Sequence, residues 1–334
     1  MVTTAPKRRT VIRSAPAKIN LYLHVTGRRD DGFHELDSLV VFADVGDVIT
    51  VEDGAGLSLS ITGPFAESLP ADDDNLVLRA ARLLAAHANI RADAHITLEK
   101  NLPIASGIGG GSADAAATLK ALVDFWGIEL SDHDIHHVAH DIADDLDTAR
   151  TLSTLFKLWR DDLGANMLDV IGLELGADVP VCLQGLPVYM GGIGERLDMA
   201  PHLPPAWLVL VNPGAHVSTP EIFKAYKASE KDFSKPARFH NHPRDATQLA
   251  ALLAERTNDL MAPAQALTPE IQIVLDSLND TGDALLTRMS GSGATCFALF
   301  ATKSSARAVA QRLAQAHPQW WIKAAEMLET PPNF

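Results

Sequence analysis

The stretch "LPIASGIGGGSADAAATL", residues Leu102–Leu119, decides how the rest of the sequence is interpreted. It contains Gly107 and Gly109–Gly111, then Ser112 and an alanine-rich run that predicts a helix to about Trp126. Free backbone N–H groups at a helix start, together with the helix dipole, favour a bound anion. We therefore predict a phosphate-holding loop, with a purely structural glycine turn as the alternative.

The two common phosphate fingerprints fit this loop poorly. A P-loop needs a lysine after its last glycine, and no lysine follows Gly111. The dinucleotide pattern G-x-G-x-x-G is matched by Gly107 and Gly109, but Ser112 stands where the third glycine belongs. What remains is a cradle of main-chain N–H groups, with the hydroxyls of Ser106 and Ser112 available to a phosphate or a metal.

Composition limits the class of protein. The chain has 334 residues, enough for about two domains, and 47% hydrophobic residues, which is typical of a globular enzyme. Its net charge of −14 argues against a nucleic-acid partner, so an anionic ligand needs a local cluster of cations. No apolar run approaches the roughly 20 residues of a membrane span, and the basic N-terminus lacks the apolar core of a secretory signal.

Two cysteines lie in apolar runs. Cys182 and Cys296 are therefore predicted to be buried free thiols of a reducing compartment. We expect a cytoplasmic protein with no membrane partner and no nucleic-acid partner.

The first half of the chain predicts mainly strands. In "KINLYLHV", Lys18–Val25, apolar residues alternate with polar ones, so one face is core and the other carries Lys18 and Asn20. A turn follows, then short strands at 38–43, 47–52 and 57–62. Asp74 or Asn75 is expected to cap a helix, and a strand at 95–100 leads into the glycine loop.

The pattern restarts after residue 200. A buried strand at 207–211 precedes a helix for which Thr219 is the expected N-cap, and helices follow near 245–257 and 268–279. Strands at 284–289 and 295–301 flank the link Ser290, Gly291, Ser292 and Gly293, which could be an ordinary hairpin turn. A helix at 304–316 and a strand at 320–327 complete an α+β fold of two domains, 10–200 and 201–334.

The segment 131–166 is acidic and rich in histidine. Four histidines, His133, His136, His137 and His140, share one side of a predicted helix. The opposite side is apolar, which indicates that the histidines face solvent rather than a metal.

Three motifs, in this order, resemble the GHMP small-molecule kinases, named for galactose, homoserine, mevalonate and phosphomevalonate. They are "PAKINLYLHVTGRRDDGFHEL" (Pro16–Leu36), "LPIASGIGGGSADAAA" (Leu102–Ala117) and "MSGSGATCFALF" (Met289–Phe300). The first motif, with "LGADVPVCLQG" and "NPGAHVSTPEIF", is similar to the branch that acts on a cytidyl-linked alcohol. The resemblance covers residues 13–325 and implies an N-terminal domain like those of ribosomal proteins, a ferredoxin-like C-terminal domain and an active site in the cleft between them.

The resemblance also implies a reaction and its residues. ATP would phosphorylate the 2-hydroxyl of a diphosphocytidyl methylerythritol, in the non-mevalonate route to isoprenoid precursors. Lys18 and Asp178 match the catalytic pair, although a solvated lysine and a simple helix cap are their plain alternatives. The expected ATP contacts are Pro103, Ile104, Ala105, Ser106, Gly107, Ile108, Gly109, Gly110, Gly111, Ser112, Asn75 and Lys100. The expected acceptor contacts are Asn20, Phe33, His34, Thr219 and Phe223, and Ser290–Gly293 forms a supporting loop.

These matches assign chemical roles. Asp178 would accept the hydroxyl proton, with Lys18 keeping it ionised and offsetting developing charge. Phe33 and Phe223 would stack on cytosine, and His34 would read its edge; many relatives have tyrosine in place of Phe33. ATP is the expected co-substrate, with Mg²⁺ for which Ser112 is a candidate ligand.

Two questions stay open at this stage. The segment 131–166 is an insertion of about 30 residues relative to the family, and it leaves the geometry near Asp178 and the oligomeric state open. We expect a monomer or weak homodimer. Three alternatives also stand: a GHMP kinase for another alcohol, a dinucleotide-dependent oxidoreductase that uses Gly107–Gly111, and a nucleotide sensor without catalysis.

Overall fold

The computed structural model describes residues 9–129 and 167–330. The insertion at 131–166 and its four histidines lie outside the described residues. The strands are β1 (Thr10–Arg28), β2 (His34–Glu52), β3 (Leu57–Thr62), β4 (Ala94–Glu99), β5 (Val188–Gly192), β6 (Arg196–Met199), β7 (Trp207–Asn212), β8 (Leu286–Met289), β9 (Cys296–Phe300) and β10 (Trp321–Leu328). The helices are η1 (Ala66–Ser68), α1 (Leu76–His87), α2 (Gly110–Trp126), α5 (Met167–Leu175), α6 (Val179–Gln184), α7 (Thr219–Ala228), α8 (Ala246–Ala254), α9 (Met261–Leu267), α10 (Glu270–Asn279) and α11 (Lys303–Ala316).

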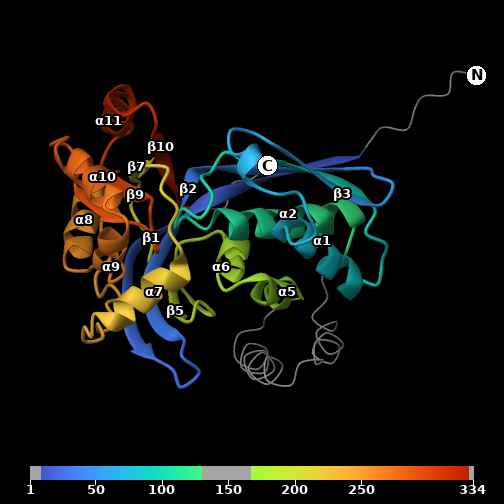
Figure 1. Ribbon diagram of the computed structural model, residues 1–334, viewed down its shortest axis with the longest axis horizontal. Helices are drawn as coiled ribbons and strands as arrows, with labels where there is room; N and C mark the ends of the chain where they lie inside the picture. Colours follow the sequence, from blue (N-terminus) through green and yellow to red (C-terminus); the bar gives the residue numbers. More distant parts are fainter. Residues whose placement is uncertain (1–8, 130–166, 331–334) are drawn as a thin grey trace, which may run out of the picture.

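A long antiparallel hairpin of β1 and β2 organises the molecule (Figure 1). The two strands pair from Thr10 opposite Glu52 to Arg28 opposite His34. The sequence predicts separate strands at 38–43 and 47–52, and this is wrong, because β2 is continuous through Gly46. A Cβ atom at Gly46 would lie 2.2 Å from the carbonyl oxygen of Ala15, so the missing side chain lets the two backbones pass.

The first layer packs helices on the sheet around this hairpin. β4 pairs with the second half of β2, β3 runs parallel to β4, and β5 and β6 extend the first half of β2. Helices α1, α2, α5 and α6 share one apolar core with these strands. Small alanine side chains let α2 lie close against β1 and β2. This packing fixes the position of the N-terminus of α2, which follows the glycine loop.

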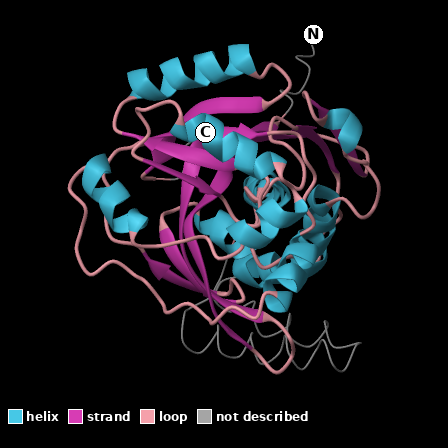
Figure 2. Ribbon diagram, turned by 60° about the vertical axis from the view of Figure 1, so that its left-hand side comes forward, coloured by secondary structure: helices cyan, strands magenta, loops and turns pink. Residues whose placement is uncertain are grey.

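A second antiparallel sheet forms the C-terminal half, in the order β10-β7-β9-β8. It joins the first sheet where Met327 and Leu328 of β10 pair with Ala43 and Phe42 of β2. Figure 2 shows the strands running through the middle of the molecule with helices on the outside. The division into domains at 10–200 and 201–334 stays a prediction.

The polar face of β1 is buried. Lys18, Asn20, Tyr22 and His24 are each 7% exposed or less. The first glycine loop lies against Lys18, and C-terminal segments contact Asn20 and His24. The backbone N–H of Leu23, for example, donates to the Thr257 carbonyl at 3.0 Å. The strand therefore has a core on one side and a polar network on the other, and the solvated-lysine alternative for Lys18 is wrong.

Smaller differences concern helix ends. Ser218, not Thr219, is the N-cap of α7, since Thr219 already has helical geometry and Pro220 follows it in the first turn. Helix α9 was not predicted. Asn75 caps α1 by accepting the Val77 N–H at 3.0 Å.

The two cysteines are buried and free, as predicted. In the part of the chain that the structure describes, no helix is both long and apolar enough to cross a membrane.

Candidate active site

Two glycine loops, far apart in the sequence, press against each other. The Thr295 N–H donates to the Ser106 carbonyl at 3.1 Å, and the Ser290 hydroxyl donates to the Gly107 carbonyl at 3.1 Å. A Cβ atom at Gly107 would lie 2.6 Å from main-chain atoms of Ser290 and Gly293, and its φ is +74°. Only glycine fits this contact, so the Ser290–Gly293 link is a partner of the first loop and not merely a hairpin turn.

The first loop delivers free N–H groups to the start of α2. Gly109 is left-handed, with φ of 65°, and its carbonyl accepts the first bond of the helix, from Ala113. The N–H groups of Gly110, Gly111 and Ser112 precede that bond, so the helix ladder leaves them free. This is the arrangement that binds a phosphate.

Lys18 lies beside this helix start. Its backbone N–H donates to the Ile108 carbonyl at 2.9 Å, and a Cβ atom at Gly109 would lie 3.1 Å from the lysine side chain. Its Nζ lies 2.9 Å from Oδ2 of Asp178 and 3.4 Å from Oδ1 of Asn20. The lysine side chain is 4% exposed and that of Asp178 is 38% exposed, so the pair links a buried amine to a carboxylate at the surface of a cavity.

Asp178 occupies the N-cap position of α6, but its side chain makes no capping bond. Its carboxylate binds Lys18 instead. The alternative that Asp178 serves only as a helix cap is therefore wrong.

A cavity of about 1010 Å³ contains this arrangement. Most of the predicted site residues line it: Lys18, Asn20, Phe33, His34, Ala105, Ser106, Gly107, Gly109, Gly110, Gly111, Ser112, Asp178, Thr219, Phe223, Gly291 and Ser292. Outside its lining lie Asn75, Lys100, Pro103, Ile104, Ile108, Ser290 and Gly293. The structure therefore brings the predicted catalytic pair, the phosphate loop and the predicted acceptor contacts to one cavity.

Lys100 has two carboxylate partners beneath the loop. Its Nζ lies 2.5 Å from both Asp47 and Asp114, and all three side chains are buried. The other oxygen of Asp47 accepts the N–H groups of Asn101 and Leu102, which begin the loop. Burial raises the pKa of Asp114 well above its usual range, against the opposing effect of Lys100. A role for Lys100 in contacting ATP stays a prediction.

The same cavity is lined by aromatic side chains from the hairpin turn and from α7. The ring of His34 stacks on Phe223 with centroids 5.1 Å apart and planes inclined by 21°, and Phe33 is 58% exposed at the hairpin turn. Burial lowers the pKa of His34, and the charges of Arg28 and Lys227 lower it further. A neutral imidazole offers one donor and one acceptor, which suits the edge of a base.

The structure adds residues that the sequence did not single out. Asn258 is 3% exposed; its Nδ2 donates to the carbonyls of Met289 and Gly291, both at 2.8 Å, and so holds the second glycine loop. Ser38 accepts from the Asn20 amide at 2.8 Å and fixes its orientation. The sequence signal for Asn258 is a polar run, "ERTND", at the end of the helix predicted near 245–257.

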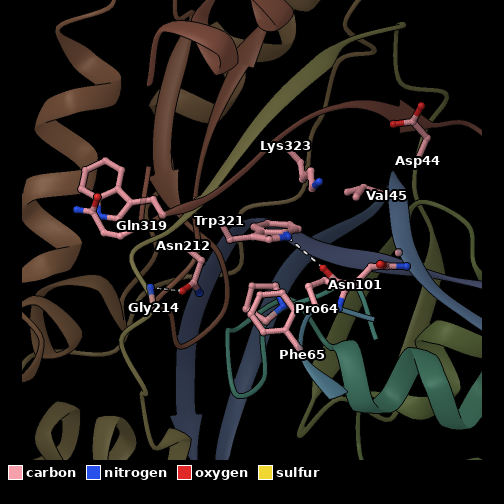
Figure 3. A pocket seen from close by; sticks show the side chains of 13 residues that line it. Asp44, Val45, Pro64, Phe65, Asn101, Asn212, Gly214, Gln319, Trp321 and Lys323 are labelled. Carbon is pink, nitrogen blue, oxygen red and sulfur yellow. Dashed lines mark hydrogen bonds between the residues drawn. The ribbon is translucent and has the colours of Figure 1, made fainter. Parts of the chain in front are cut away.

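A second cavity, of about 560 Å³, lies where the two sheets meet. Figure 3 shows Trp321 beside Phe65 and Asn101, with its indole N–H donated to the Asn101 carbonyl at 3.0 Å. Pro103 lines this cavity, but neither Lys18 nor Asp178 does. We therefore place the chemistry in the larger cavity.

Comparison with known proteins shows the family of the chain. Residues 75–151 match the family model for the GHMP kinases N terminal domain, and residues 237–319 match that for the GHMP kinases C terminal domain. The chain belongs to the GHMP kinases, and it has their two-domain fold. It is thus an ATP-dependent small-molecule kinase, and the oxidoreductase alternative is wrong.

Individual relatives within the GHMP kinases have more specific names. The chain is 48% identical to a 4-diphosphocytidyl-2-C-methyl-D-erythritol kinase of Paramagnetospirillum magneticum, over 94% of this chain and 97% of the relative. It is 50% identical to the enzyme of that name from Cereibacter sphaeroides, over 94% and 98%. A crystal structure of a 4-(cytidine 5'-diphospho)-2C-methyl-D-erythritol kinase has a TM-score of 0.69 and 31% identity, covering 95% of this chain and 98% of its own. A homoserine kinase from Cytophaga hutchinsonii shares the fold, with a TM-score of 0.63, 16% identity and coverage of 100% and 99%.

The contact at Gly107 predicts a specific effect of Gly107→Ala. Left-handed strain alone should cost about 1–2 kcal/mol of unfolding free energy, and the clash should add about 1–3 kcal/mol. Gly56→Ala is the matched control, because Gly56 has φ of +91° with nothing within 4 Å. Urea denaturation should show the larger loss for Gly107→Ala, with a KM for ATP raised about tenfold or more. Equal losses and an unchanged KM would contradict the contact.

The environment of His34 predicts its titration. Because burial and two cations oppose protonation, the NMR midpoint of its imidazole should lie below the ordinary value of about 6.5. Lys227→Gln removes one cation and should raise the midpoint. Arg307→Gln, an equal charge change on α11, should leave it unchanged. A wild-type midpoint at or above the ordinary value would contradict this description of the site.

Proposed function

We propose that this kinase transfers the γ-phosphate of ATP to the 2-hydroxyl of 4-diphosphocytidyl-2-C-methyl-D-erythritol, in the non-mevalonate route to isoprenoid precursors. The names of its relatives support this, at 46–50% identity over 93–98% of the chain. The observation that carries it is one cavity with the Lys18–Asp178 pair and the free amides of α2 at one end, and the stacked His34 and Phe223 at the other.

Asp178 is the proposed proton acceptor. Phosphoryl transfer depends mainly on positioning and charge stabilisation, so the protein has little covalent work to do. An alcohol is a much weaker acid than a carboxylic acid, and its proton therefore moves late, as the bond to phosphorus forms. The exposed carboxylate of Asp178 faces the cavity, where an acceptor hydroxyl can reach it.

Lys18 is the proposed electrostatic partner. Its ammonium, 2.9 Å from Asp178, offsets negative charge that develops near the carboxylate during transfer. The side-chain oxygen of Asn20 accepts from the lysine Nζ, and Ser38 fixes the orientation of the Asn20 amide. The free N–H groups at the start of α2 would bind phosphate oxygens of ATP.

The oxygen donors near the start of α2 suit a magnesium ion that is bound together with ATP. Within residues 9–129 and 167–330 there is no group of three or more His, Cys, Asp or Glu residues suited to a metal. Mg²⁺ in kinases is commonly held by one or two protein oxygens together with substrate phosphates, so the hydroxyl of Ser112 at the start of α2 fits an ion bound with ATP. There Mg²⁺ would neutralise phosphate charge.

The acceptor end has the chemistry for cytosine. A base that takes the place of the His34 ring on Phe223 would gain about 1–3 kcal/mol from stacking, without selection among bases, and the exposed Phe33 lines the same cavity. The neutral imidazole of His34 would then select by hydrogen bonding. A uracil ring exchanges donor and acceptor on that edge, which would leave buried polar groups unpaired.

The acceptor assignment is tested by ADP release with several alcohols side by side. We expect turnover with the cytidyl-methylerythritol, and only background release with homoserine, mevalonate or galactose. The uridyl counterpart is the matched control; its kcat/KM should be lower by on the order of 10² or more. Comparable turnover of the uridyl compound would contradict the role of His34, and preference for another alcohol would contradict the proposed substrate.

A further inference from the structure

We propose that Arg28, Lys224 and Lys227 form a binding site for the diphosphate group of the acceptor, and we call these three residues the cationic rim. This inference rests on the proposed function, because it assumes that the acceptor is a nucleoside diphosphate derivative. It assigns to the acceptor a phosphate site separate from the glycine loop.

The cationic rim is assembled from two elements at one end of the cavity. Arg28 is the last residue of β1, at the hairpin turn, while the two lysines lie on α7. All three line the cavity that contains Lys18 and Asp178. Residues three or four apart share a helix face, so Lys224 and Lys227 lie on the same side of α7, with Lys227 one turn from Phe223.

These cations have no carboxylate partner. Among the described residues, no Asp or Glu lies within ion-pair distance of Arg28, Lys224 or Lys227. The adjacent Arg29 shows the contrast, since it pairs with Asp31 at 3.3 Å and with Glu195 at 3.7 Å.

The guanidinium of Arg28 is positioned by the turn. Its Nε donates to the Gly32 carbonyl at 3.2 Å, across the end of the hairpin. This bond uses one of the five N–H donors of arginine. The planar group is thus oriented, with donors left for a phosphate, which guanidinium can bind in a bidentate manner.

The charge of the cavity lining favours an anionic ligand. Its lining includes four cations, Lys18 and the cationic rim, against the single carboxylate of Asp178, in a protein of net charge −14. Lys18 is already bound to Asp178, and the helix start of α2 suits the phosphates of ATP. The rim charges are exposed and have no carboxylate partner within the described ranges, so they are available to a different ligand.

The position of the rim identifies that ligand. Arg28 lies opposite His34 in the register of β1 and β2. Lys227 is one helical turn from Phe223, on which His34 stacks, so both charges lie at the aromatic end of the cavity. In a nucleoside diphosphate the phosphates follow directly after the base and ribose. A base stacked on Phe223 would place its diphosphate beside this same turn of α7.

Binding of cytidine and CDP tests the inference. Calorimetric titrations with ADP saturating the phosphate loop would compare wild type with the double variant Arg28→Gln/Lys227→Gln. We expect the Kd for CDP to rise about 10- to 100-fold, because two charge-assisted contacts are lost, and the Kd for cytidine to stay unchanged. Arg307→Gln, on α11, is the matched control for net charge and should bind both ligands as wild type does.

The possible outcomes separate the two proposals. Unchanged CDP affinity in the double variant would overturn the cationic rim and leave the proposed function standing. Equal weakening of cytidine and CDP would also overturn it, since the two cations would then only support the aromatic stack. A wild-type protein that binds neither ligand would overturn the cytidyl acceptor itself, and the rim with it.

Discussion

The contact of Gly107 with the Ser290–Gly293 loop is the constraint on which the site depends. It joins a loop of the first sheet to a loop of the second, with no side chain between the two backbones. Asn258 fixes the second loop from behind, and the Lys100–Asp47 pair fixes the start of the first. Because both loops are held by buried polar groups, the amides at the start of α2 keep their position without a ligand.

The electrostatics of the site follow from this packing. Lys18 is buried on β1 because the glycine loop before α2 lies against it, and a buried amine requires a partner. Asp178 supplies it from the surface of the cavity, which leaves the carboxylate accessible. Positive charge is thus concentrated in one cavity of an acidic protein, where it attracts anionic ligands without making the whole surface basic.

The sequence predicted those parts of the site that short motifs specify. The Gly107–Ser112 loop and the helix after it follow from the sequence, and the structure brings Lys18 to Asp178. Side chains whose partners lie far away in the chain were not predicted: Asn258 looks like an ordinary loop residue, and Asp47 like the polar first residue of a strand. The continuity of β2 through Gly46 was missed because a glycine between strands usually ends a strand, and here it permits a backbone crossing.

The claim that Lys18 and Asp178 act as one unit is tested most directly by a double-mutant cycle on kcat/KM. Lys18→Met, Asp178→Asn and the double variant would be assayed by ADP release with the cytidyl-methylerythritol, after each is shown to be folded. We predict a loss of on the order of 10³ for each single variant, and little further loss for the double variant, because each change removes the same pair. Losses that multiply in the double variant would show that the two groups act independently and would contradict the proposed mechanism.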